Sequence, residues 1–270
     1  MTASPPPAVV RAAASGTAEL VETTDEPGSA EGVAAGEAHD GVADQEALAP
    51  AAQQAMAVRV LSAINDPATA ALPRHRHDLS RTEVRRRQQA RILAALVHEV
   101  LDHGYDRVTV AGLGRRAGVS SKTFYEMYAD KEAAFLDLYI LLDAGITLLA
   151  EVLASCTSVT EALEVGFELQ FGIFADQGAI TRVITLDALG ATERIVARRV
   201  ESFDYFVDVI ARTAARLGQH PSRELVVAAV GAINELVFRA FLGGEGHRMR
   251  ELKPVARDIF LRLLAPGATG

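Results

Sequence analysis

Apolar residues recur at spacings of three and four from residue 80 onward, and no stretch of useful length alternates as a β-strand does. This pattern predicts helices almost throughout. The first helix begins at Ser80-Arg81-Thr82-Glu83, which reads as a capping box, and ends at Gly104. Its predicted apolar face consists of Ile92, Leu93, Leu96, Val97, Val100 and Leu101.

Two short helices joined by a tight turn are predicted next. Thr109 is typical of a helix N-cap, and Gly118 is suited to the left-handed conformation that a tight turn requires. Ser120 caps the second short helix, where Phe124 and Tyr128 share the inward side at i and i+4. The other side chains of this helix then lie largely outward: Ser121, Lys122, Thr123 and Tyr125.

The rest of the chain also reads as helical. Asp130 caps a longer helix, and an amphipathic helix is indicated before residue 80, over Gln53–Ile64. We therefore predict an all-α protein with an N-terminal three-helix domain containing a helix-turn-helix, over residues 85–146, and a C-terminal helical bundle over residues 147–270. Candidate helices of the bundle cover about 160–175, 192–217, 222–242 and 251–264.

The charged residues are distributed unevenly along the chain. The formal net charge is -8, and residues 1–50 hold nine acidic residues against Arg11 alone. That segment is rich in Ala, Gly, Pro and Glu, so we expect a disordered acidic tail. Residues 51–84 form an N-terminal extension that ends in a basic arm: from Arg74 to Arg91 there are seven arginines against Asp78 and Glu83. Such a run is often only a solvated face, but it also suits nucleic acid.

The outward residues of the second short helix favour the nucleic-acid interpretation. In a helix-turn-helix, one helix braces another whose N-terminal half enters the major groove of double-stranded DNA. Hydroxyls on that half can hydrogen-bond to phosphates or base edges, and Lys122 can reach either. The hydroxyl of Tyr125 can contact a phosphate while its ring packs. A helix-turn-helix can also be purely structural, but here the basic helix start, the hydroxyls and the turn fall on one face.

The stretch from Thr109 to Glu132, TVAGLGRRAGVSSKTFYEMYADKE, resembles the DNA-binding domain of the tetracycline-repressor (TetR) family nearly end to end. The resemblance covers about residues 85–146, and the remainder is similar to that family's regulatory domain only in length and class. It implies an N-terminal arm at Arg85 and Arg86 that runs along the DNA. It further implies DNA contacts by Thr109, Ser120, Ser121, Lys122, Thr123, Tyr125 and Lys131, the last with a backbone phosphate.

Two glycines depart from the family pattern. Gly112 and Gly114 stand in the bracing helix, where better helix formers are common, at an expected cost of roughly 1 kcal/mol each.

A regulator of this kind needs two recognition helices and a signal. We expect a homodimer, because one helix reads only a few base pairs. Its candidate interface combines an apolar stripe with small residues, although both can be intrachain core: Val196, Val200, Phe203, Val207 and Ile210, then Ala228, Ala229, Gly231 and Ala232. The resemblance implies a repressor that binds a palindromic operator and is released by a small-molecule inducer. Phe167, Phe171 and Phe174 are the candidate ligand contacts, or simply core residues.

Other classes of protein are less well supported by the sequence. An enzyme is not indicated, since we find no phosphate-binding loop, paired-cysteine metal site or nucleophile elbow, and no cofactor motif. His75 and His77 lack a third metal ligand, and Cys156 is typical of a small buried hydrophobe. An interaction module acting through the acidic tail remains an alternative. The apolar runs are shorter than a membrane helix requires, and there is no signal pattern, so we expect a cytoplasmic protein that does not bind membranes.

Overall fold

The computed structural model describes residues 50–66 and 79–264. The predicted acidic tail therefore lies outside the described residues, as do Arg74 and Arg76 of the basic arm and His75 and His77. Within the described parts the chain folds into helices and turns, with no strand. The N-terminal helices are α2 (Pro50–Asn65), α3 (Arg81–His103), α4 (Val110–Ala117), α5 (Ser121–Tyr125) and α6 (Lys131–Asp137), with the short helix η2 (Tyr105–Arg107) between α3 and α4.

The longer C-terminal helices follow the predicted ranges closely, whereas α9 and the short helices η3 and η4 are additions. The helix α9 was not predicted: it is short, and it follows α8 after a single residue, so no separate pattern marks it. The elements are α7 (Tyr139–Ala154), α8 (Val159–Asp176), α9 (Gly178–Thr185), η3 (Asp187–Gly190), α10 (Glu193–Arg216), α11 (Arg223–Leu242), η4 (Gly246–Leu252) and α12 (Lys253–Leu264).

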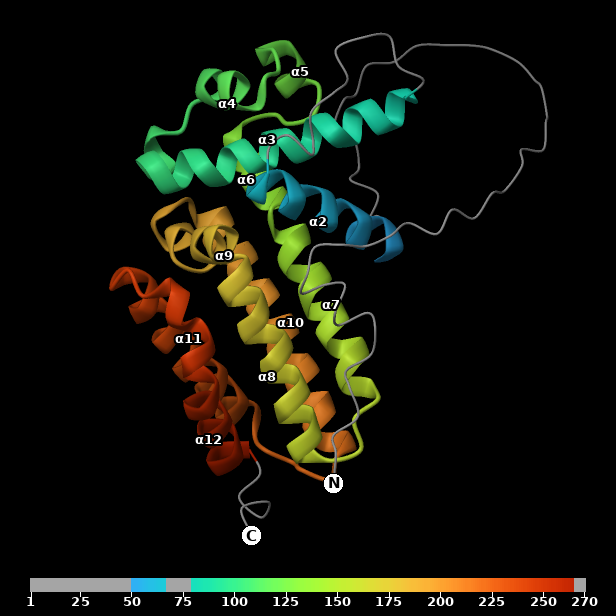
Figure 1. Ribbon diagram of the computed structural model, residues 1–270, viewed down its shortest axis with the longest axis vertical. Coiled ribbons are helices and arrows are strands. Elements are labelled where there is room, and N and C mark those ends of the chain that lie inside the picture. The colour runs from blue at the N-terminus through green and yellow to red at the C-terminus, as the bar shows by residue number, and fades with distance from the viewer. Residues whose placement is uncertain (1–49, 67–78, 265–270) are drawn as a thin grey trace, which may run out of the picture.

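The helices form an elongated molecule (Figure 1). The helix α3 crosses one end of it, and α4 and α5 lie on the outer side of α3. Below α3, the helices α7, α8 and α10 run along the molecule, with α11 and α12 at their side. The helix α2 lies under α3 and beside α7, and it contacts both.

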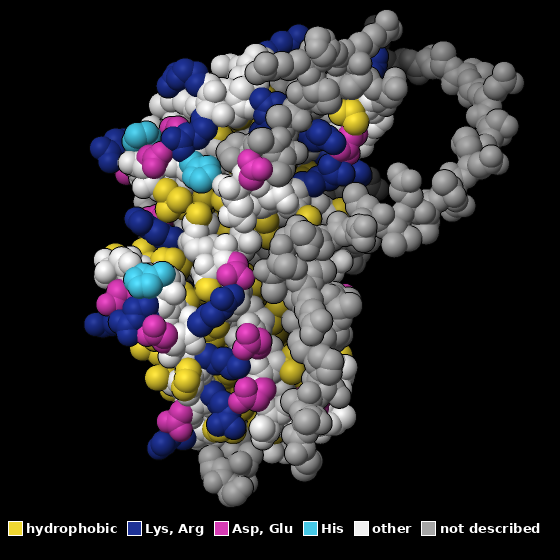
Figure 2. Space-filling view, in the orientation of Figure 1, with side chains coloured by type: hydrophobic (Ala, Val, Ile, Leu, Met, Phe, Trp, Pro, Cys, Tyr) yellow, Lys and Arg dark blue, Asp and Glu magenta, His cyan; other side chains and the backbone are white. Residues whose placement is uncertain are grey.

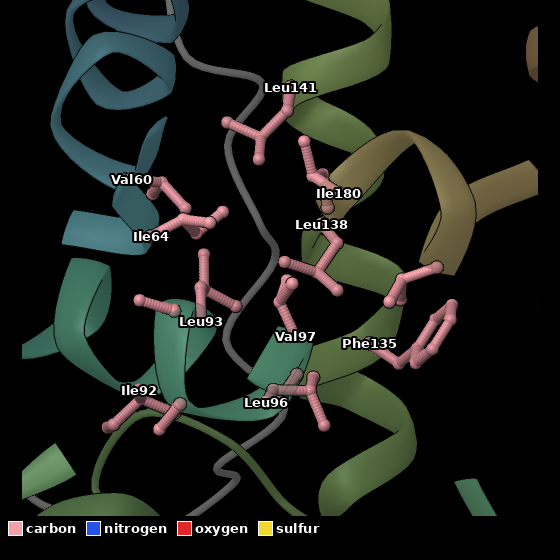
Figure 3. Close-up of a cluster of buried hydrophobic side chains, with 14 of the residues drawn as sticks. Val60, Ile64, Ile92, Leu93, Leu96, Val97, Phe135, Leu138, Leu141 and Ile180 are labelled. Atoms are coloured by element: carbon pink, nitrogen blue, oxygen red, sulfur yellow. The ribbon is translucent and has the colours of Figure 1, made fainter. Parts of the chain in front are cut away.

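One hydrophobic core joins the two parts of the molecule. It contains buried residues of α2, α3 and α4, the start of α7, and α9. Figure 3 shows Val60 and Ile64 of α2 projecting toward Leu93 of α3, with Leu141 of α7 and Ile180 of α9 nearby. The three-helix domain therefore does not have a core of its own, because its apolar face is completed by helices of the bundle.

The bundle has two further cores at its other end. One lies between α8, α10, α11 and α12 and includes Phe171 and Phe260. The other lies between α7, α8 and α10 and includes Leu149. The helix α7 contributes Tyr139–Ala144 to the shared core and Ile146 onward to the distal one. The change of core falls between Ala144 and Ile146, while α7 itself runs through that point unbroken.

Helix N-caps are where the sequence signals were clearest. The side chains of Ser80, Thr109, Ser120 and Asp130 each accept a hydrogen bond from a backbone N–H of the first helical turn. The capping box predicted at Ser80 is wrong in one of its two hydrogen bonds, the one from the Ser80 backbone N–H to the Glu83 side chain. The Glu83 carboxylate accepts instead from Arg59 of α2 at 2.7 Å and from Arg87 at 3.0 Å. Two arginines outcompete one backbone amide for an ionised carboxylate.

Two described segments, Lys131–Ala154 and Arg223–Leu242, are long and apolar enough to cross a membrane by length and composition alone. The length of uninterrupted apolar runs did not indicate these segments, because isolated polar residues break a run without much lowering the mean hydropathy of the segment. The first segment, α6 with α7, packs in the cores described above. The second, α11, has only 28% of its most apolar window buried, so it presents apolar surface on the outside of the bundle.

Candidate nucleic-acid interface

The turn between α4 and α5 is built around Gly118. Its φ of 63° is in the left-handed region, and its N–H and that of Val119 bond back to the last turn of α4. Arg91 of α3 donates from Nη2 to the Gly118 carbonyl at 2.8 Å. A Cβ on Gly114 would stand 2.9 Å from the carbonyl oxygen of Val119, so α4 lies close against the turn and Gly114 is suited to this position. The close packing that Gly114 permits offsets part of the helix propensity that α4 loses by having a glycine at this position.

We expect Gly118→Ala to lower the free energy of unfolding by about 1–2 kcal/mol, because an L-residue is strained in the left-handed region. The added Cβ would also collide with Nη2 of Arg91. Urea unfolding followed by circular dichroism measures the change. Gly145→Ala is the control: Gly145 lies within α7, and no atom lies within 4 Å of the place that its Cβ would take, so the variant should gain up to about 1 kcal/mol of helix propensity. Equal changes in both variants would contradict the role given to the turn.

The inner side of α5 is fixed by aromatic residues. Phe124 is fully buried, and its ring lies 5.7 Å from that of Tyr128. The Tyr128 hydroxyl donates to Oδ2 of Asp137 at 2.6 Å, and Gln89 of α3 donates to the same oxygen. Burial raises the pKa of the Tyr128 hydroxyl well above its usual value, and the Asp137 carboxylate raises it further. Tyr128 follows α5, which ends at Tyr125, so its protonated hydroxyl ties the segment directly after α5 to α3 and α6.

The outer side of α5 carries the predicted contact residues. The Lys122 side chain is 86% exposed and Tyr125 is 59% exposed. Ser120 and Ser121 are exposed as well, and Thr123 is partly so. The Ser120 hydroxyl already accepts from the N–H of Thr123 at 3.0 Å and lies 2.9 Å from its hydroxyl. The nearest acid to Lys122 is Glu126, at 4.0 Å, too far for a strong ion pair. This face can accept an anionic partner without first breaking a stable contact.

The remaining predicted contacts are placed differently. Thr109 is exposed and caps α4 through its hydroxyl. Arg85 and Arg86 are exposed on the first turns of α3, and Arg85 reaches the Glu126 carbonyl near the end of α5 at 3.5 Å. Figure 2 shows several Lys and Arg side chains around this end of the molecule, with Asp, Glu and His side chains among them.

The Lys131 side chain makes contacts that the resemblance did not suggest. Its Nζ donates to the carbonyls of Tyr105, Asp106 and Val108 at 2.9, 3.1 and 3.1 Å. It also lies 4.5 Å from the centroid of the Tyr105 ring, a cation–π contact. A lysine has three N–H donors, and all three are used here. The geometry favours Lys131 as a support for the turn before α4 rather than as a free phosphate ligand.

Some residues that shape the interface were missed by the sequence reasoning. Arg91 was counted only as part of the basic run, yet it braces the turn. Arg116 pairs with Glu99 at 3.0 Å and with Asp102 at 2.6 Å, and so fixes α4 to α3. No local sequence pattern predicts these pairs, because each depends on how two helices cross.

The bundle contains a cavity at the end away from α5. It measures about 660 Å³ including its open mouth, and α7, α8, α10 and α12 line it. Leu153, Phe206 and Phe260 are among its apolar walls, and its few polar side chains, Gln170, Thr213 and Gln219, are uncharged. Of the three predicted ligand contacts, Phe167 lines this cavity. Phe171 is buried in the neighbouring core and Phe174 packs against it, so neither borders the cavity.

Comparisons with known proteins agree with the geometry of the helix-turn-helix. Residues 92–138 match the sequence profile of bacterial regulatory proteins of the tetR family. This range begins within α3 and ends directly after α6. No curated protein matches the chain in sequence.

Solved structures share the fold over much of the chain. The fatty acid degradation regulator FadR from Bacillus halodurans aligns with a TM-score of 0.58 at 16% identity, covering 63% of this chain and 96% of its own. FadR from Bacillus subtilis, solved in complex with stearoyl-CoA, aligns with a TM-score of 0.56 at 15% identity, covering 64% and 96%. A transcriptional regulator from Pseudomonas aeruginosa aligns with a TM-score of 0.51 at 18% identity, covering 63% and 88%.

The profile spans the turn and both of its helices, and the fold around them is that of regulators with an N-terminal helix-turn-helix and a C-terminal helical domain. Residues 92–138 therefore form a helix-turn-helix DNA-binding domain of the tetR family of bacterial regulatory proteins, within a helical fold that solved transcriptional regulators share.

Proposed function

We propose that this protein is a cytoplasmic repressor that binds a palindromic operator in double-stranded DNA as a homodimer and is released by an apolar small molecule. The observation that carries the proposal is the outer face of α5. Lys122, Ser121 and Tyr125 are exposed there on a helix whose opposite side is held by buried Phe124 and Tyr128. Such a helix can approach base edges closely without rearrangement.

The homodimer is supported by α11. Leu225 and Val227 are large exposed apolar residues near its start, and Leu242 is 65% exposed at its end. Ala228 and Gly231 lie between them on accessible positions and are small enough for close helix packing. The predicted stripe on α10 fits an interface less well, because Val207 is fully buried and Phe203 packs against the same core. We therefore assign the interface to α11, with a second copy of the chain as its partner.

Release from DNA requires a ligand, and the side chains that line the cavity limit what kind of molecule that ligand can be. An environment of aliphatic and aromatic side chains with no charged group suits a hydrocarbon chain, since each buried CH₂ contributes about 0.8 kcal/mol. Gln170, Thr213 and Gln219 can accept or donate hydrogen bonds to one polar group of such a ligand. The complex of Bacillus subtilis FadR with stearoyl-CoA suggests a long-chain acyl thioester as the first probe.

Binding of stearoyl-CoA should be blocked by a large side chain in the cavity. Ala214 lines the cavity, whereas its neighbour Ala215 is exposed. We expect Ala214→Trp to weaken binding at least about tenfold, a loss of about 1.4 kcal/mol, because the indole would occupy the space of the hydrocarbon chain. Ala215→Trp is the matched control and should bind as the wild type does. Isothermal titration measures both, with coenzyme A alone as the non-acylated comparison. Equal binding by both variants would place the ligand elsewhere.

The experiment that tests the proposed function is selection of bound fragments from genomic DNA, followed by fluorescence anisotropy with the recovered duplex. We expect a sequence with two-fold symmetry and an affinity that falls steeply with salt. Addition of stearoyl-CoA should release the DNA. An enzyme or an interaction module without specific DNA binding would recover no common sequence, and that result would overturn the proposal.

A further inference from the structure

The helix α2 lies outside the residues that match the family profile, and it packs where the two parts of the molecule meet. One side of it is buried. Met56, Val60, Ala63 and Ile64 belong to the core that α3 shares with α7 and α9. The opposite side faces solvent, where Val58 is 47% exposed. Figure 1 shows α2 lying between α3 and α7.

Polar contacts tie α2 to both sides as well. Near its middle, Arg59 pairs with Glu83 at the start of α3. Burial raises the pKa of Glu83, but Arg59 and Arg87 together lower it further and keep it below its usual value. At its C-terminal end, the Ile64 carbonyl lies 3.0 Å from Nε2 of His98 in α3. The next residue, Asn65, donates from Nδ2 to Oε1 of Gln177, directly before α9, at 3.0 Å.

We propose that α2 is an intramolecular clamp that fixes the orientation of the helix-turn-helix relative to the bundle. The helix α3 carries α4 and α5: Arg116 pairs α4 with α3, and Arg91 of α3 bonds to the turn that leads into α5. An element that holds α3 on one side and α7 and α9 on the other therefore sets where α5 stands with respect to the bundle. The consequence for DNA rests on the proposed function: in a dimer, the direction of α5 sets the spacing of the two recognition helices.

The core that α2 covers does not consist of α2 alone. The first core continues through α3, α4, α6, α7 and α9 without α2, and α3 still contacts α9 directly. Loss of α2 should therefore loosen the angle between the two parts while leaving each of them helical. A ligand or a partner that displaced α2 would act on the DNA-binding end without entering the cavity.

The test compares Val60→Asp with Val58→Asp in the full chain. Both introduce the same charge on the same helix, but Val60 is fully buried and Val58 is exposed. Spin labels are placed at Arg115→Cys on the outside of α4 and Glu151→Cys on the outside of α7, with Cys156→Ser to remove the native thiol. Dilution with excess unlabelled protein ensures that double electron–electron resonance reports distances within one chain.

We expect one narrow distance distribution for the unmodified helix and for Val58→Asp, and a broad distribution for Val60→Asp. A narrow, unchanged distribution in Val60→Asp would overturn the proposal. If Val60→Asp does not fold, removal of residues 1–66 takes its place, and complete unfolding of that variant as well would overturn the proposal by making α2 an indispensable part of the core. The distances are measured without DNA, so failure of the protein to bind any duplex would reject the proposed function and leave the clamp standing.

Discussion

The double substitution Lys122→Ala with Tyr125→Phe should lower the affinity for the selected duplex by at least about 100-fold, because each base or phosphate contact is worth about 1–3 kcal/mol and a dimer loses it twice. The thermal unfolding temperature should remain that of the wild type. Both side chains lie largely in solvent, and the ring of Tyr125 is retained against Phe124. Fluorescence anisotropy at fixed salt measures the affinity, and circular dichroism measures the unfolding.

The matched control makes the same chemical changes far from α5. Lys253 pairs with Glu164 and Glu168 between α12 and α8, and the Tyr205 hydroxyl lies 3.3 Å from that of Thr147. Lys253→Ala with Tyr205→Phe should leave DNA affinity unchanged, although it removes a lysine and a tyrosine hydroxyl as well. If the two double variants bound alike, whether strongly or weakly, α5 would not be the recognition helix.

The position of this face could be predicted from sequence because its signals are local. Ser120 caps its helix, Gly118 takes a left-handed conformation, and Phe124 and Tyr128 turn inward, all within one short stretch of the chain. Helical periodicity is equally local, which is why the ends of α8, α10, α11 and α12 fall within a few residues of the predicted ranges.

What the sequence could not provide are contacts between distant segments. Lys131 has the position of a phosphate ligand in the family pattern, yet the carbonyls that hold it belong to residues 105–108 and depend on how that turn folds back. Phe167, Phe171 and Phe174 recur at helical spacing, but only the crossing of α8 with its neighbours decides that the first lines a cavity and the second fills a core. The position of α2 between α3 and α7 likewise has no signature in its own residues.

Substitution of Gly231 by Arg should convert the proposed dimer to a monomer and reduce the affinity for the selected duplex by about 100-fold or more, since linking two binding sites raises avidity by about 10²–10⁴. No atom lies within 4 Å of the position that a Cβ would take on Gly231. Arginine therefore fits the isolated chain, and its better helix propensity should raise the stability of the monomer by up to about 1 kcal/mol. In a close helix pair the same side chain would meet the partner. Sedimentation velocity measures the mass, and anisotropy measures the affinity.

Gly172→Arg provides the comparison, because Gly172 also lies within a helix, α8, with no atom within 4 Å of its Cβ position. It should remain dimeric and bind DNA as the wild type does. The pair of variants separates two explanations for the apolar surface of α11. If that surface packs against a second copy, only the charge at Gly231 disrupts the assembly; if it is merely exposed, both variants sediment alike. A dimer that survives Gly231→Arg would require another surface to join the two recognition helices, and the spacing of the half-sites would have to be explained without α11.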